Sequence, residues 1–198
     1  MATQAELIKK LREETGAGIL DAKKTLEEMG GDYDKALSIL KAKGIAKAEK
    51  KSGERTANDG AIETYVHNGK VGVMVEINCE TDFVARTPQF KEVAHAVALQ
   101  IAAMNPKYVS PEQIPADELA ATKKTFEDAT RAEGKPDNIV EKIVAGKLDK
   151  YFAETCLYRQ PYIKDDKQTI EELVKAASAQ TGEKIQVRRF VRYALGEE

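Results

Sequence analysis

The stretch AIETYVHNGKVGVMVEINC, residues 61–79, decides the fold because it has the pattern of a β-hairpin. Two runs rich in β-branched residues flank Asn68-Gly69, the dipeptide favoured in a two-residue type I′ turn. Placing His67 opposite Lys70 gathers the apolar residues of both runs on one side. The cross-strand pairs on that side are Val66–Val71, Thr64–Val73 and Ile62–Val75, and Ile77 and Cys79 continue it. This register predicts a half-buried sheet.

A third strand is predicted near the C-terminal end, over KIQVRRFVRYAL, residues 184–195. Apart from Arg189, alternate positions on one side are apolar, as in a strand with one buried face. These positions are Ile185, Val187, Val191 and Tyr193. We expect this strand to pair with the hairpin. Met74 and Phe190 make the second face of the sheet partly apolar, which indicates a partner surface and favours dimerisation.

Helices are predicted between the hairpin and the third strand. Thr87-Pro88 combines a capping threonine with proline at the first helical position, and this helix ends at Asn105-Pro106. Its apolar stripe consists of Phe90, Val93, Val97, Ile101 and Met104. The other predicted helices cover 117–133 before Gly134, 139–156 with a weak point at Gly146, and the segment from the capping box at Thr169 to Gly182. The fold class is therefore α+β, a small three-stranded antiparallel sheet with helices packed on one face.

The first 44 residues are predicted to form a separate three-helix domain, followed by a linker at 45–58 and the α+β domain at 59–198. Glycines in TGAG (15–18), at 30–31 and at Gly44 separate and end the three helices. Their buried positions are Leu7, Ile8, Leu11, Ile19, Ala22, Leu26, Met29, Ala36, Leu37 and Leu40. The lysine-rich stretch between Lys41 and Lys51 is also compatible with RNA binding. A linker is favoured, because no aromatic residue is interleaved to stack on bases.

Composition excludes several classes of protein. The chain has 198 residues and a net charge of −2, so no global basic field points to nucleic acid or to a membrane surface. No segment approaches the roughly 20 apolar residues of a membrane span, and the N-terminus lacks a signal peptide. Cys79 and Cys156 match no metal or redox spacing, so buried thiols in a reducing cytoplasm are expected.

The sequence shows no pattern typical of residues that carry out covalent chemistry. His67 and His95 have no neighbour in sequence that would complete a metal pair or a nucleophile dyad. Phosphate-binding loops of the forms GxxxxGK[ST] and GxGxxG are absent from the sequence. We therefore expect no catalytic residue, no metal ligand and no cofactor, and a protein that is not an enzyme.

The segment CETDFVAR, residues 79–86, places a carboxylate, Asp82, beside a large aromatic, Phe83, where a strand ends. In a structural interpretation, Phe83 packs under the next helix and Asp82 caps a turn. Thr87 can already cap that helix, however, and Phe90 can already anchor it. In the functional interpretation, the pair forms an exposed corner that docks on another protein.

Several long motifs resemble those of the elongation factor Ts family. The closest correspondence is HNGKVGVMVEINCETDFVAR (67–86), and LREETGAGILDAKKTLEEMGGDYDKALSIL (11–40) is similar to the family's N-terminal domain, a three-helix fold of the ubiquitin-associated type. The other motifs are PKYVSPEQIP (106–115), KPDNIVEKIVAGKLDKYFAE (135–154), QPYIKDDKQTIEEL (160–173) and RRFVRYALG (188–196). They follow one another in the family's order and cover essentially the whole chain.

The resemblance implies a guanine nucleotide exchange factor for elongation factor Tu, acting in translation elongation. Family members bind the GDP form of that GTPase and speed release of GDP, so that GTP can bind. The resemblance assigns displacement of the partner's magnesium ion to Thr81, Asp82, Phe83 and Val84. It assigns binding to the partner's nucleotide-binding domain to Arg12, Ile19, Leu20 and Lys23. From the residues alone, Ile19 or Leu20 is equally compatible with the helical core.

Longer family members carry a second sheet subdomain and a protruding coiled-coil hairpin, and this chain is too short for both. It resembles the short members, which pair as homodimers and so supply the second subdomain from another copy. Two other functions stay open: an adaptor that binds unrelated partners through its ubiquitin-associated-like helices, and an RNA-associated ribosomal factor acting through Lys41–Lys51.

Overall fold

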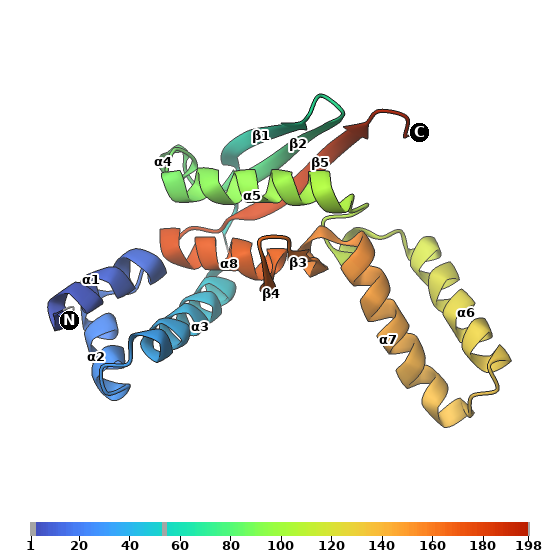
Figure 1. The fold of residues 1–198 in the computed structure, drawn as a ribbon, viewed down its shortest axis with the longest axis horizontal. Helices are drawn as coiled ribbons and strands as arrows, with labels where there is room; N and C mark the ends of the chain where they lie inside the picture. The colour runs from blue at the N-terminus through green and yellow to red at the C-terminus, as the bar shows by residue number, and fades with distance from the viewer. Residues whose placement is uncertain (1–2, 53–54, 198) are drawn as a thin grey trace.

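The computed structural model describes residues 3–52 and 55–197, with the backbone alone for 47–52. Among these residues the main sheet has three antiparallel strands in the order β1-β2-β5. They are β1 (Asp59–His67), β2 (Val71–Cys79) and β5 (Gln186–Ala194). Helix α5 (Pro88–Met104) lies across one face of the sheet, and α8 (Ile170–Thr181) packs along α5 (Figure 1). The α+β class is confirmed.

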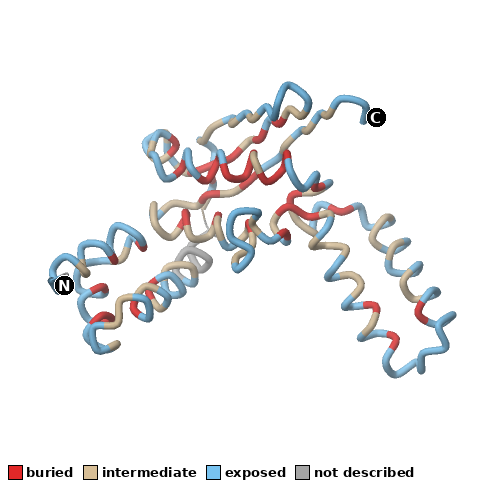
Figure 2. The backbone as a smooth tube through the Cα atoms, viewed as in Figure 1, coloured by how far each residue is buried: buried red, intermediate tan, exposed pale blue. Residues whose placement is uncertain are grey.

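The main core lies between the sheet and these two helices, where Figure 2 shows buried residues along α5 and β2. Thr87 caps α5 by accepting the Phe90 N–H at 3.2 Å, with Pro88 at the first helical position as predicted. Along the predicted stripe of α5, Phe90, Val93, Val97 and Ile101 are buried, whereas Met104 is exposed. Cys79 and Cys156 are buried thiols, as expected.

The hairpin forms, but the predicted register is wrong by one residue. His67 pairs with Val71 rather than with Lys70, and the Lys70 N–H donates to the His67 carbonyl at 2.9 Å. The turn therefore contains Lys70 as well as the left-handed residues Asn68 and Gly69. Because side chains alternate between faces, this shift turns one side of β1 over. Ile62, Thr64 and Val66 were predicted to face the core and instead face outward.

The third strand was predicted with one uniform face, and a β-bulge makes that prediction wrong over its second half. Ile77 pairs with Val187, whereas Glu76 pairs with Arg189, so Arg188 is the extra residue. Beyond the bulge the alternation is reversed. Phe190, opposite Val75, packs against the core, and Val191, opposite Met74, faces outward with Tyr193. Of the two residues predicted on the outer face, Met74 is there and Phe190 is not.

The N-terminal helices α1 (Gln4–Thr15), α2 (Ile19–Glu28) and α3 (Tyr33–Ser52) form a second cluster. Its buried apolar residues are Leu11, Ala22, Leu26, Ala36 and Leu40. Helix α3 was predicted to end at Gly44 and instead continues to Ser52. A Cβ atom on Gly44 would lie 3.1 Å from the Ala179 Cβ, so the glycine allows close packing of α3 on α8.

Between α5 and α8, helices α6 (Ala116–Ala132) and α7 (Asp137–Thr155) form an antiparallel hairpin that projects from the body (Figure 1). Gly146 does not interrupt α7. The chain was expected to be too short for a second sheet subdomain and for a protruding helical hairpin, and for the hairpin that expectation is wrong. The short 3₁₀ helices η1 (Pro111–Gln113) and η2 (Leu157–Arg159) flank it, and strands β3 (Pro161–Tyr162) and β4 (Asp165–Thr169) form a small sheet that was not predicted.

Candidate functional site

The corner after β2 is a single helical turn, α4 (Asp82–Ala85). Thr81 begins it, and the Thr81 Oγ1 accepts the Val84 N–H at 3.5 Å. Ala85 is buried beneath the turn, whereas the Phe83 side chain is 78% exposed. The structural interpretation, in which Phe83 packs under the next helix and Asp82 caps the turn, is wrong. The ring points into solvent and Thr81 is the cap.

Helix α4 is joined directly to the capped end of α5. The Thr87 hydroxyl donates to the Val84 carbonyl at 2.8 Å while its oxygen caps α5. A helix of one turn has little stability of its own, so these end contacts determine its orientation. The backbone that carries Phe83 is therefore fixed at both ends, while the Phe83 side chain itself is exposed.

The Asp82 carboxylate accepts a hydrogen bond from the Arg86 guanidinium at 2.7 Å, one turn further along. Both side chains are solvent-accessible, with exposed fractions of 45% and 77%. Exposed ion pairs contribute at most about 1 kcal/mol. Asp82 can consequently exchange Arg86 for donors on another molecule at a small cost in free energy.

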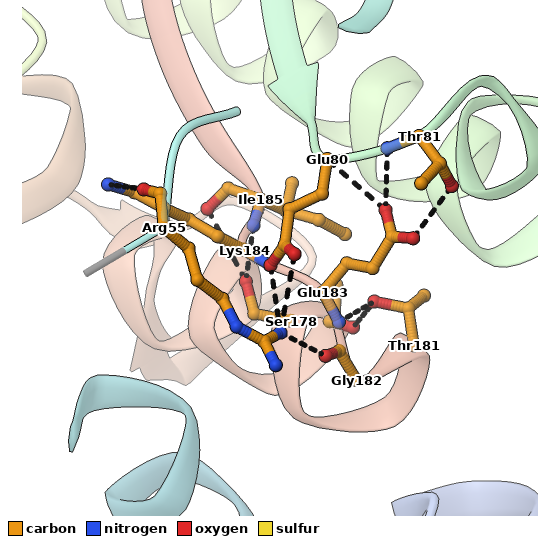
Figure 3. Close-up of polar contacts among 10 residues, drawn as sticks. Arg55, Glu80, Thr81, Ser178, Thr181, Gly182, Glu183, Lys184 and Ile185 are labelled. Carbon is orange, nitrogen blue, oxygen red and sulfur yellow. Dashed lines mark hydrogen bonds and ion pairs between the residues drawn. The ribbon is translucent and has the colours of Figure 1, made fainter. Parts of the chain in front are cut away.

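A polar cluster joins the corner to the chain that leaves α8 (Figure 3). The Glu80 carboxylate accepts the Lys184 N–H at 2.7 Å and pairs with the Arg55 guanidinium at 3.0 Å. Burial opposes ionisation of Glu80, but the Lys184 N–H and the Arg55 charge together hold the pKa of this carboxyl below its ordinary value of 4.5. Arg55 also donates to the Gly182 carbonyl at 3.1 Å. The segment entering β1 is thus attached to the same cluster.

The Cys79 thiol lies at the base of the corner and donates to the Thr81 carbonyl at 3.1 Å. Burial, together with the nearby Glu183 and Asp59 carboxylates, raises the pKa of this thiol to about 11. A thiol with so high a pKa is a poor nucleophile at neutral pH. Cys79 fills space under the corner, where it is fully buried.

The residues matched to partner binding in the N-terminal helices are all at the surface. Ile19 and Leu20 are 56% and 78% exposed, and Arg12 and Lys23 are also exposed. Ile19 was predicted in the buried stripe of α2, and that prediction is wrong. Thr25 is buried on that stripe instead, between Ala22 and Leu26. Two adjacent exposed aliphatic side chains at a helix start suit protein docking.

The structure keeps these two groups of residues on separate elements. The end of α8 and the residue just beyond it bond to α1 and to the corner, respectively. The Gln180 side chain donates to the Glu13 carbonyl at 2.8 Å, and Glu183 accepts hydrogen bonds from the corner at Thr81. Figure 1 places α4 and the α1–α2 pair at the same end of the molecule.

A cavity of about 450 Å³ lies between the N-terminal helices and α8. Its ionisable lining residues are of both signs and include Lys43, Arg55, Glu80, Glu171 and Glu183. Such a mixed lining does not select an anionic ligand. Within residues 3–52 and 55–197, no cluster of three or more His, Cys, Asp or Glu is arranged to hold a metal ion. In the same described part of the chain, no helix is long and apolar enough to cross a membrane.

The outer face of the main sheet carries a second exposed apolar group. Its members are Ile62, Val66, Met74, Val191 and Tyr193. Met74 was the only one of these five assigned to that face from the sequence. The other four are placed on this face by the three-residue turn and by the bulge at Arg188. No sequence signal specifies either feature. The outer sheet face is therefore partly apolar, as predicted, but with a different composition.

Comparison with known proteins places the chain among translation factors. The sequence profile of the family described as Elongation factor TS matches residues 37–197. The chain is 55% identical over 198 residues to Elongation factor Ts of Thermotoga petrophila, covering 100% of this chain and 98% of that relative. It is 52% identical over 198 residues to Elongation factor Ts of Coprothermobacter proteolyticus, with both chains covered completely. The protein of the same name from Myxococcus xanthus is 51% identical over 193 residues, covering 98% of this chain and 88% of that relative.

Proposed function

The chain belongs to the elongation factor Ts family of translation elongation factors, and from this premise we propose that it is a guanine nucleotide exchange factor for elongation factor Tu. It binds the GDP form of that GTPase in the cytoplasm, displaces the bound magnesium and promotes release of GDP so that GTP can bind. The observation that carries this proposal is the exposed Phe83 on a corner held at both ends.

Phe83 acts as a wedge that enters an apolar pocket of the GTPase. Burying a phenylalanine side chain fully contributes about 1.5–3 kcal/mol, and this ring is available because its own chain does not cover it. A rigid carrier matters because a flexible loop would lose conformational entropy on docking. Because the end contacts of α4 already order this turn, little conformational entropy remains to be lost on docking.

Asp82 acts beside the wedge, where it leaves Arg86 and competes for hydrogen-bond donors of the phosphate-binding elements. Magnesium bridges phosphate oxygens of a bound nucleotide and neutralises their charge. Displacing it therefore weakens nucleotide binding without any covalent step. The factor binds the GTPase with its magnesium displaced more tightly than the GDP-bound state, and by linkage it weakens GDP in the same proportion.

The N-terminal helices supply a docking surface separate from the wedge. Arg12, Ile19, Leu20 and Lys23 contact the nucleotide-binding domain of the GTPase, which places the corner near the nucleotide site. Their exposure supports this role. We propose the division into residues 1–44 for docking, 45–58 as connection and 59–198 as the domain that carries the corner.

The protein acts as a homodimer through the outer face of its sheet. The three-stranded sheet carries apolar side chains on both faces, and in the described part of the chain helices cover only one of them. A second copy of the chain presents an identical apolar face, so two sheets can pack on each other. Glu76, opposite Ile62 on this face, pairs with Arg188 and Arg189, so ion pairs border the apolar group.

The proposal is tested by release of fluorescent GDP from purified elongation factor Tu. Adding this protein should accelerate release, and the rate should saturate with its concentration. An unchanged release rate at saturating protein would overturn the proposal. Binding of RNA with a steep dependence on salt would favour an RNA-associated factor instead.

A further inference from the structure

Glu183 lies just beyond the end of α8 in sequence, yet its carboxylate is placed against the corner (Figure 3). Its Oε2 accepts two backbone hydrogen bonds, from the Glu80 N–H at 3.1 Å and from the Thr81 N–H at 3.0 Å. Its Oε1 accepts the Thr81 hydroxyl at 2.7 Å. Three donors of the segment that leads into α4 thus converge on one side chain.

The turn after α8 puts Glu183 in this position. Gly182 has φ 77°, a left-handed conformation that ends the helix and redirects the chain. Beyond it, the Ile185 N–H donates to the Ser178 hydroxyl at 2.9 Å, which fixes the start of the return segment. The carboxylate is therefore presented by a constrained backbone.

Glu80 and Glu183 brace the two segments reciprocally. Glu183 accepts the N–H of Glu80, while Glu80 accepts the N–H of Lys184, the residue next to Glu183. Each acidic side chain satisfies backbone donors of the other segment. Charged acceptors make hydrogen bonds shorter and stronger than neutral ones do. This crossed arrangement fixes the end of β2 relative to the end of α8.

The hydrogen bond between Glu183 and the Thr81 hydroxyl reaches α4 through the helix cap. Because that hydroxyl donates its only proton to Glu183, its oxygen is left as an acceptor for the Val84 N–H. Without the carboxylate the hydroxyl is free to rotate and to donate elsewhere. The Glu183 carboxylate thus orients the hydroxyl that caps α4.

We propose that Glu183 is a positioning residue for nucleotide exchange, which orients α4 so that Phe83 and Asp82 meet the GTPase in one geometry. This inference rests on the exchange function proposed above. Glu183 acts through Thr81 and the backbone of the corner. Neither the motif at 79–86 nor the N-terminal docking residues include it.

The test measures release of fluorescent GDP from elongation factor Tu as a function of factor concentration, for Glu183→Ala and Glu183→Gln. We expect Glu183→Ala to lower the maximal rate by roughly 10-fold, because a site misplaced by about 1 Å loses much of its effect. The half-saturating concentration should stay within about 2-fold, because the N-terminal docking surface is untouched. Glu183→Gln should lie between Glu183→Ala and the wild type, since its amide oxygen still accepts from the backbone.

The matched control is Glu171→Ala, which removes a carboxylate from the first turn of α8 without touching the corner. It should release GDP as the wild type does. Thermal unfolding establishes that each variant is folded, and Glu183→Gln carries the test should Glu183→Ala not fold. Amide hydrogen exchange of the factor alone should rise at residues 80–85 in the Glu183 variants.

A combined variant separates positioning from a general loss of structure. In a Phe83→Ala background, Glu183→Ala should lower the maximal rate by less than about 2-fold further, because its effect passes through the corner. A full additional loss in that background would overturn the inference, as would an unchanged maximal rate in Glu183→Ala. If the wild-type protein itself fails to accelerate release, the proposed exchange function falls instead.

Discussion

Phe83 and Phe90 lie on the consecutive helices α4 and α5 and have opposite environments: Phe90 is fully buried, whereas Phe83 is 78% exposed. Phe90 supplies the aromatic anchor that fixes α5 on the sheet. The core therefore has its aromatic anchor in Phe90 and does not need Phe83. A large apolar side chain on a fixed corner is the kind of residue that carries binding free energy at protein interfaces.

The docking role of the N-terminal helices predicts a change in affinity with no change in the exchange step. Leu20→Ala removes an exposed aliphatic side chain at the start of α2. It should raise the half-saturating concentration in the GDP-release assay by about 5–10-fold, the effect of removing an interface residue that contributes more than 1 kcal/mol. The maximal rate should be unchanged.

Lys24→Ala is the control for Leu20→Ala, because Lys24 lies on the same helix and pairs only with Glu28 among the ion pairs of the described chain. It should leave both parameters as in the wild type. A lower maximal rate with an unaltered half-saturating concentration in Leu20→Ala would count against docking through α2.

The proposed homodimer predicts that a charge on the outer sheet face separates the subunits. Val191→Glu places a carboxylate at the centre of the apolar group, next to Met74 on β2. Burying that unpaired charge costs several kcal/mol, so the variant should sediment as a monomer at micromolar concentration. Analytical ultracentrifugation of the wild type should show a dimer.

Ile163→Glu, an exposed isoleucine beside the small β3-β4 sheet, provides the comparison and should remain dimeric. A wild-type protein that sediments as a monomer at micromolar concentration would contradict the dimer.

The Glu80 carboxyl predicts a specific dependence of stability on pH. Its pKa in the folded protein is held below 4.5, so ionised Glu80 stabilises the fold at neutral pH. That contribution is complete above the unfolded pKa and is lost as the pH falls through the lower folded pKa. Glu80→Gln should therefore be less stable at about pH 7 and should lose less free energy of unfolding between about pH 5 and pH 3. Urea unfolding measures this, and parallel pH profiles for the two proteins would contradict it.

Features that depend on neighbouring residues could be predicted from the sequence. The start of α5 at Thr87-Pro88 and the capping box at Thr169 were confirmed, because each cap involves residues within one turn. The hairpin was predicted from Asn68-Gly69, but the number of residues in its turn was not. That number determines which face each side chain of β1 occupies.

Features that depend on distant partners could not be predicted. The bulge at Arg188 lets both Arg188 and Arg189 reach Glu76 on the neighbouring strand. Gly44 permits close packing of α3 on α8. In the sequence, a glycine that allows such packing looks the same as a glycine that ends a helix. For the candidate site, the family resemblance predicted residues 81–84. The partner of Thr81, Glu183, is remote in sequence and was found only from the structure.

The most direct test of the wedge is the maximal rate of fluorescent-GDP release from elongation factor Tu with Phe83→Ala. Met104→Ala, an exposed apolar side chain at the far end of α5, is the matched control. Removing the ring should slow stimulated release by at least about 10-fold, the effect of losing about 1.4 kcal/mol of differential binding. The fold, followed by thermal unfolding, should be unchanged. A Phe83→Ala protein that releases GDP as fast as the wild type would contradict the account.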